Sequence, residues 1–350
     1  MAEPLVKRHS GLPRTIALFE SIPLAPIWIG LLIAGLWFSV YLIYAYLVGW
    51  IDGSRHLGDP LWEMQFWFEL IQAVMIGYAP TVATYWLQGT VQDLHALGPA
   101  LACSDTEFQA ELKKLTGFER RPQVLAALVG VVIGLVTVFY PGIWFGGRPA
   151  LGDPLLTWGI LRSVLLFSLV AHTVYVSIAL TSRLSRTGER RVQVDLLDVT
   201  PLTPFARNGL RGALLLTGWI VLTSLLLLAP WSGDIAIGGL CVVLGLAVAT
   251  LLWPVLGVHR RIREAKRMEL ERVRAAIRLE SSVRIESRGK WQAPSVHLSD
   301  LIVYKGLIES VNTWLFDLPA LLKFSLIVLV GVGSWLGQAF VERLLGVFID

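Results

Sequence analysis

The sequence predicts an all-α polytopic membrane protein with seven transmembrane helices, an inward N-terminus, an outward C-terminus and a cytoplasmic helical anchor. The first observation is composition, since the mean hydropathy is +0.63 and only 16% of the residues are charged. A soluble domain of this size carries more charge. The other two observations are seven apolar runs of membrane-spanning length and a one-sided distribution of lysine and arginine. We therefore expect a multi-pass protein of the plasma (inner) membrane, with the lipid bilayer as its first partner.

Each predicted span has about 20 or more mostly apolar residues, which is enough to cross roughly 30 Å of hydrocarbon. The seven spans are residues 26–48, 66–87, 124–145, 157–181, 209–229, 235–257 and 318–340. The first run is too long and too proline-interrupted at its start for a cleaved signal peptide, so we expect it to remain as a span.

Basic residues set the predicted orientation. Twenty-four of them lie in the segments 1–23, 88–123, 182–208 and 258–317, whereas the opposite loops hold only Arg55, Arg148 and Arg343. Cationic loops are retained in the cytoplasm, so the first set of segments is predicted to face inward. The net charge of +4 is thus a topology signal, and we expect no nucleic-acid partner.

Three regions follow from this layout: spans 1–6 with their loops (1–257), an anchor (258–317) and a last span (318–350). In the loop after span 2, Ser104 and Glu107 have capping-box spacing and predict a short helix through about Leu115. The apolar, proline-marked stretch 194–204 is predicted to lie along the membrane surface or against another cytoplasmic segment.

The anchor is predicted to be a helical hairpin. Span 6 continues without a breaker into a charged helical sequence, and the polar stretch 287–294 then turns the chain around before a second helix that Ser295 or Ser299 caps. That returning helix carries apolar residues at heptad spacing: Leu301, Tyr304, Ile308, Val311 and Leu315. The seam predicts either packing on the chain's own extended span-6 helix or a bundle between subunits.

Motifs for catalysis and cofactor binding are missing from the sequence. The six histidines and two cysteines have no metal-ligand spacing, and no catalytic serine motif, P-loop or dinucleotide fingerprint occurs. We therefore expect no enzyme, no catalytic residue, no cofactor and no metal site. Arg162, Glu69 and Lys323 lie near span ends, where we expect their charged groups to reach the interface.

The last span carries an organised polar stripe. Gly331, Ser334, Gln338 and Glu342 are spaced by 3, 4 and 4 residues and share one helix face, which Phe324 and Ile327 continue inward as apolar positions. This face predicts either a buried central helix or the lining of a pore, with an apolar constriction toward the cytoplasm.

Two resemblances add to this interpretation. The stretches 195–211, 253–266 and 308–342 resemble a group of uncharacterised multi-spanning proteins of bacteria and archaea, which implies no known activity. The architecture resembles insect odorant and gustatory receptors, and this implies a tetrameric cation channel whose final span lines the pore. Those receptors end in a Gln-Phe signature, whereas here Ala339 separates Gln338 from Phe340.

The sequence thus favours a homo-oligomeric, channel-like protein, with a tetramer as the first hypothesis and ions or a small-molecule ligand of unknown identity. A secondary transporter is the second hypothesis, although no inverted repeat is evident. A membrane scaffold that binds a cytoplasmic partner through its basic helices is the third.

Overall fold

The computed structural model describes residues 22–49, 60–101, 103–139, 152–192, 194–226, 233–286 and 296–314, together with Leu322 and residues 325–326. Regular structure in this part of the chain is helical. The only pairing of extended backbone described is an isolated antiparallel bridge between Leu101 and Val192. The helices are α2 (Pro26–Leu47), α3 (Pro60–Leu97), η1 (Gly98–Ala100), α4 (Asp105–Thr116), α5 (Arg120–Phe139), α6 (Pro154–Arg191), η3 (Thr200–Leu202), α7 (Thr203–Leu226), α8 (Gly233–Glu286) and α9 (Val296–Ser310).

Six of the described helices are long and apolar enough to cross a membrane, namely α2, α3, α5, α6, α7 and α8. Each of them overlaps one of the first six predicted spans, and the predicted all-helical class is confirmed for this part of the chain. The seventh predicted span, residues 318–340, lies almost entirely outside the described residues.

Three helices are much longer than a bilayer requires. Helices α3 and α6 have 38 residues each and α8 has 54, which at 1.5 Å per residue gives about 57 Å and about 81 Å. About 20 residues suffice for a span, so these helices continue well beyond one. All three extend toward the same side, where α4, the start of α7 and α9 also lie; we call this side the anchor end.

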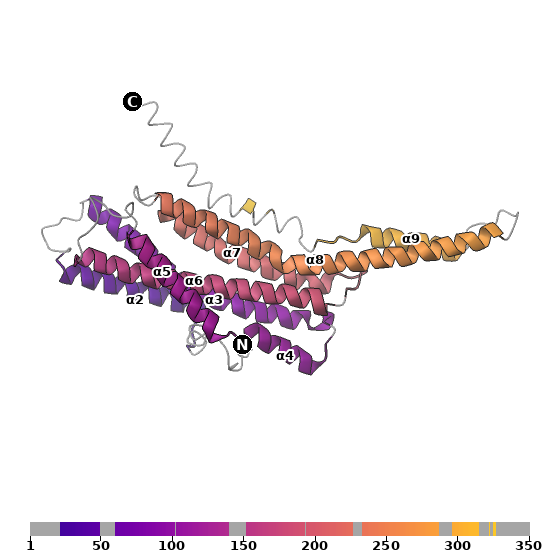
Figure 1. The fold of residues 1–350 in the computed structure, drawn as a ribbon, viewed down its shortest axis with the longest axis horizontal. Coiled ribbons are helices and arrows are strands. Elements are labelled where there is room, and N and C mark those ends of the chain that lie inside the picture. The colour runs from indigo at the N-terminus through magenta and orange to yellow at the C-terminus, as the bar shows by residue number, and fades with distance from the viewer. Residues whose placement is uncertain are drawn as a thin grey trace, which may run out of the picture.

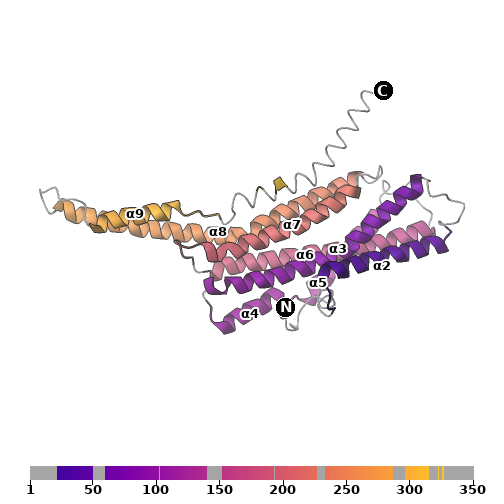
Figure 2. The ribbon, with the colours of Figure 1, turned by 180° about the vertical axis from the view of Figure 1, so that it is seen from behind.

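The most extended feature is a helical hairpin at the anchor end. Helix α8 runs past the ends of the other helices, and α9 returns along it, as Figure 1 shows from one side and Figure 2 from the other. The predicted continuation of span 6 into the anchor is therefore confirmed, and the returning helix begins at Val296, directly after one of the two predicted capping serines.

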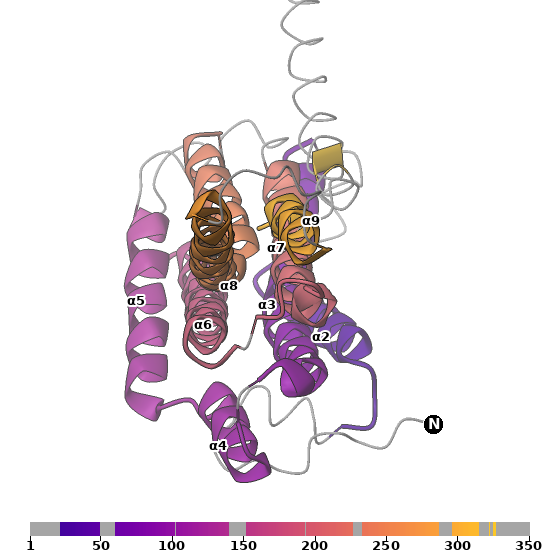
Figure 3. The same ribbon diagram turned by 90° about the vertical axis from the view of Figure 1, so that its right-hand side faces the viewer.

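Packing divides the bundle into a centre and two flanking helices. The buried apolar core is built from α3, α6, α7 and α8, whereas α2 packs mainly on α3, and α5 mainly on α6. Figure 3 shows the bundle end-on, with α5 at one flank beside α6 and α4 below them. Both flanking helices expose most of their large apolar side chains, including Leu36 (69% exposed) and Val136 (63% exposed). Such continuous apolar surface fits a lipid environment.

Glycines allow the flanking helices to approach closely. A Cβ atom added to Gly130 would lie 2.3 Å from the carbonyl oxygen of Phe167, and one added to Gly134 would lie 2.6 Å from that of Ser163. Helix α5 therefore rests on the backbone of α6 through a Gly-x-x-x-Gly surface, a contact typical of membrane helices.

Candidate functional site: the hairpin and the anchor end

The six residues predicted to line a pore, Phe324, Ile327, Gly331, Ser334, Gln338 and Glu342, all lie outside the described residues, as does Leu315 of the predicted seam. The site can therefore be built only from the segments that lead to the last span. Those segments are the hairpin of α8 and α9 and the exit segment (residues 309–314), which comprises the last two residues of α9 and the four residues after it.

Two of the described seam residues, Tyr304 and Ile308, lie against α8 of the same chain. Ile308 is fully buried, as is Ile262 of α8, and the Tyr304 hydroxyl lies 3.4 Å from a carboxylate oxygen of Glu269. This corresponds to the intramolecular alternative left open by the sequence. The outer face of α9 is apolar as well, with Ile302, Val303 and Leu307 all more than half exposed. A contact between subunits stays a prediction, and the structure offers this second face for it.

The exit segment is fastened to α8 at two points. The Lys266 ammonium donates to the carbonyl oxygens of Glu309 (2.7 Å) and Val311 (2.9 Å), so it satisfies carbonyl groups at the C-terminal end of α9. Two helical turns away, His259 Nδ1 lies 2.8 Å from the Thr313 carbonyl oxygen. The imidazole also stacks on Trp314, with ring centroids 4.4 Å apart. The chain therefore leaves the hairpin from a fixed position beside α8.

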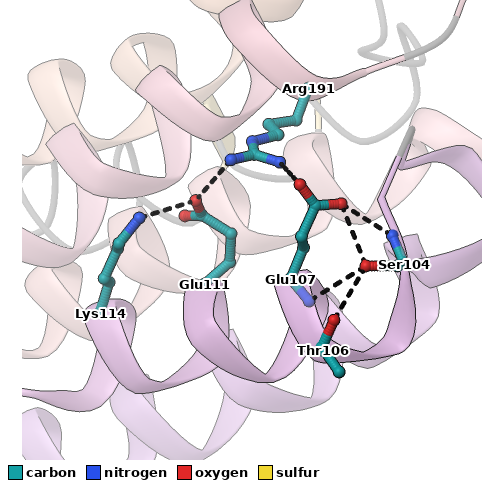
Figure 4. Close-up of polar contacts among 6 residues, drawn as sticks. All are labelled: Ser104, Thr106, Glu107, Glu111, Lys114 and Arg191. Carbon is teal, nitrogen blue, oxygen red and sulfur yellow. Dashed lines mark hydrogen bonds and ion pairs between the residues drawn. The ribbon is translucent and has the colours of Figure 1, made fainter.

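Helix α4 is fastened to the same end of the bundle, as Figure 4 shows. The predicted capping box is present: the Ser104 N–H donates to Glu107 (2.9 Å) and the Ser104 hydroxyl accepts from the Glu107 N–H (3.4 Å). Arg191, the last residue of α6, bridges Glu107 and Glu111 at 3.3 and 3.6 Å. The Ser104 hydrogen bonds and Arg191 hold the pKa of the Glu107 carboxyl below its usual value.

Arg183 secures the other end of α4. Its guanidinium donates to the carbonyl oxygens of Lys114 (2.8 Å), Leu115 (3.1 Å) and Gly117 (2.9 Å) and lies over the Phe118 ring at 4.8 Å. A cation at a helix C-terminus satisfies carbonyl groups that lack an intrahelical partner. Two arginines of α6 thus hold both ends of α4.

Deep in the bundle, two of the charged residues that were expected to reach the interface are instead paired with each other. Arg162 of α6 donates directly to Glu69 of α3, and their side chains are 6% and 0% exposed. Glu69 also accepts from the Trp158 indole (3.1 Å) and from Gln65 (3.1 Å). That expectation is therefore wrong for these two residues. Inside the bundle each charge is compensated by the other, whereas either charge buried without its partner would carry a larger desolvation penalty.

A second buried carboxylate joins α3 to α7 nearer the anchor end. The Asp93 side chain is fully buried and accepts from Arg207 Nε (2.7 Å) and from an Arg211 Nη (2.8 Å). One turn away, the Asn208 amide donates to the Thr90 hydroxyl (2.8 Å). These contacts occur because α3 continues ten residues past the predicted end of span 2, to Leu97.

A cleft of about 600 Å³ opens where residues 194–202 cross α8 and α9. This places the proline-marked stretch against another segment of the anchor end, one of its two predicted positions. The lining residues are Ala100, Val194, Asp195, Leu196, Leu197, Asp198, Pro201, Leu202, Ala265, Met268, Glu269, Arg272 and Tyr304. Burial and the neighbouring Glu269 carboxylate, with a smaller contribution from Asp195, raise the pKa of the Tyr304 phenol, which therefore stays protonated at neutral pH.

No protein-family model matches the chain. No curated protein and no solved structure is significantly similar to it. The case for a function therefore rests on the chain's own geometry and sequence.

Sequence reasoning missed the two fastenings of the exit segment and both buried ion pairs. For Glu69 and Arg162 a signal was available, since they are opposite charges in two different predicted spans. For Lys266 and His259 no such signal existed, because their partners are backbone carbonyl groups and a ring on a distant part of the chain.

Proposed function

We propose that this chain forms a homo-oligomeric membrane channel, with a tetramer as the first hypothesis, in which residues 318–340 of each subunit line a path for cations. In this proposal the anchor end faces the cytoplasm of a cell whose plasma (inner) membrane holds the bundle, and the C-terminus lies outside. The orientation is supported by the twenty-four basic residues that the sequence collects on this side.

One observation carries the proposal: the last apolar segment starts from the hairpin and not from a loop of the six-helix bundle. Helix α8 is continuous from a span into the hairpin, and Lys266 and His259 fix the exit segment beside it. In the proposed oligomer, the anchor is where subunits meet and from which residues 318–340 enter the membrane. This arrangement supports a position for residues 318–340 at the central axis of the oligomer, outside the six-helix bundle of their own subunit.

The charges within the bundle support the same assignment. Glu69 is neutralised by Arg162, and Asp93 is neutralised by two arginines, so these buried carboxylates serve contacts between helices. The 318–340 segment, in contrast, carries the polar stripe of Ser334 and Gln338, with Glu342 just beyond its outer end. An outer carboxylate raises the local concentration of cations, and the apolar positions Phe324 and Ile327 would close the inner end by dewetting.

Cysteine accessibility tests the pore. We expect a cysteine placed at Ser334 or Gln338 to react with a water-soluble thiol reagent and to reduce ion flux in reconstituted vesicles. A cysteine at Leu336, on the opposite helix face, is the matched control and is expected to leave flux unchanged. A smaller side chain at Ile327 is expected to increase leak.

The outcome is decisive only for protein that is folded and assembled, so each variant is first sized in detergent. Inert cysteines at both 334 and 338 in an intact oligomer would return the stripe to helix packing. A monomer without a central pathway would favour a scaffold, and a flux that saturates with substrate would favour a transporter.

A further inference from the structure

The cleft at the anchor end joins three separate parts of the chain. Its walls come from the 194–202 segment, from α8, from Tyr304 of α9 and from Ala100 of η1. The volume of about 600 Å³ is that of a small-molecule site. Any molecule held there would contact the bundle and both helices of the hairpin at once.

Part of the cleft wall is apolar and open to solvent. Leu197 is 64% exposed and Met268 is 51% exposed, although both have large apolar side chains. Leu202 and Ala100, which also line the cleft, are buried. Apolar side chains that line a concave surface lose their contact with water when a ligand covers them, which favours a ligand with an apolar part.

The polar part of the cleft is negative, within a region that is otherwise basic. Three carboxylates, Asp195, Asp198 and Glu269, line it with a single guanidinium, that of Arg272, which leaves two net negative charges. Arg272 lies 3.2 Å from Glu269 and neutralises part of this charge. The segment 258–317, which supplies α9 and much of α8, holds twelve basic and eight acidic residues, so its own net charge is positive.

The two aspartates are held in place by their own loop. Asp195 accepts from the Leu197 N–H (2.9 Å) and Asp198 accepts from the Thr200 N–H (3.0 Å). The hydrogen bonds from Thr200 keep the pKa of the Asp198 carboxyl below its usual value, so this group is ionised at neutral pH. Each of these hydrogen bonds occupies one acceptor position of a carboxylate group. A carboxylate has several such positions, so others remain for a donor group of a ligand.

The carboxylates are spread around the cleft and do not converge. Among the described residues, no three His, Cys, Asp or Glu side chains lie close enough together to hold a metal ion. A larger cation that combines hydrogen-bond donors with an apolar body fits the wall better than a bare ion. The Tyr304 phenol adds an aromatic ring beside Glu269, and such rings attract organic ammonium groups.

We propose that this cleft binds an amphipathic organic cation, whose ammonium group lies between Asp195 and Glu269 and whose apolar part covers Leu197 and Met268. A ligand in this position bridges the bundle to the hairpin and stabilises their mutual arrangement. The regulatory consequence rests on the proposed function: such a ligand would alter channel opening through the exit segment, which is fastened to the same α8.

Binding is tested with dansylcadaverine, a fluorophore on a pentylammonium chain, added to the purified full-length protein in detergent. We expect saturable blue-shifted fluorescence beyond that of empty micelles. The matched anionic probe, dansylated 6-aminohexanoate, is expected to bind at least tenfold more weakly. The double variant Asp195→Asn/Glu269→Gln is expected to weaken dansylcadaverine binding about tenfold.

Two further variants keep the test decisive. Ala265→Phe fills the cleft and is expected to abolish saturable binding without altering charge. Glu271→Gln, which removes one carboxylate from an exposed part of α8 outside the cleft, is the control for a loss of charge elsewhere and is expected to bind as the unaltered chain does. Equal binding of both probes, or an unchanged Kd in both the double variant and Ala265→Phe, would overturn the site.

The proposed binding site and the proposed channel can each be refuted without the other. Fluorescence reports binding without any flux, and flux in vesicles is measured with and without the cation. Binding without flux would leave the site standing and refute the channel. Flux with no binding would do the reverse.

Discussion

The buried pair of Glu69 and Arg162 gives the sharpest test of the packing. Replacing Glu69 by Gln leaves a guanidinium in a site where its side chain is only 6% exposed, and it weakens the acceptor of the Trp158 indole. Replacing Arg162 by Met leaves a carboxylate whose side chain is fully buried, with two neutral donors. Each variant therefore removes one partner of a buried ion pair.

The magnitude follows from that burial. Breaking a buried pair costs about 3–5 kcal/mol, whereas replacing both partners is often close to neutral. At about 2–3 °C per kcal/mol for a chain of this length, each single variant should lower Tm by roughly 6–15 °C. The double variant Glu69→Gln/Arg162→Met should recover most of that loss, because no unpaired charge remains.

Thermal unfolding is followed by size exclusion after heating in detergent, which reports the loss of the folded population. The reasoning is refuted if both single variants melt within 2 °C of the unaltered chain, as side chains that reach solvent independently would. It is also refuted if the double variant loses the sum of the two single effects, since additivity means that the two residues do not interact.

Three other outcomes are expected. Gly134→Ala should lower Tm by several degrees because its Cβ would meet the Ser163 carbonyl oxygen at 2.6 Å, whereas Gly245→Ala, with nothing within 4 Å, should leave Tm unchanged or slightly raised; equal melting of the two would contradict the close helix contact. A reporter active only in the cytoplasm should be active when fused after Arg288 and inactive when fused after Asp350, and the opposite pattern would reverse the orientation. Lys266→Met should speed hydrogen exchange in the exit segment by at least tenfold, and unchanged exchange would show that the two carbonyl contacts do not hold it.

The sequence predicts those parts of the fold that depend on interactions between residues close together in the chain. A run of apolar residues must hydrogen-bond its own backbone in lipid, so the six helices that are long and apolar enough to cross a membrane follow from hydropathy. Helix α4 begins where the capping box of Ser104 and Glu107 predicts, because both groups lie within one turn. The hairpin follows similarly from a charged helical continuation and a polar break.

Pairings between distant segments could not be predicted in the same way. A heptad places Tyr304 and Ile308 on one face of α9 without identifying the helix that covers that face, and here α8 of the same chain covers it. Hydropathy marks only the limit of the apolar run, so Asp93 lies beyond the end of the predicted span 66–87. The helix continues past that limit to reach Arg207 and Arg211.

The length of α8 gives the hairpin a mechanical property. Pro254 interrupts one backbone hydrogen bond within the helix and is the natural fulcrum for bending. Glu286, 32 residues farther on, lies about 48 Å from it, whereas His259 lies only about 7.5 Å away. A tilt of about 5° would therefore move the tip by about 4 Å and the His259 contact by less than about 1 Å. A tilt about Pro254 would thus make the hairpin a lever of roughly sixfold advantage, in which a weak push on the tip delivers a larger force over a shorter distance to the exit segment at His259.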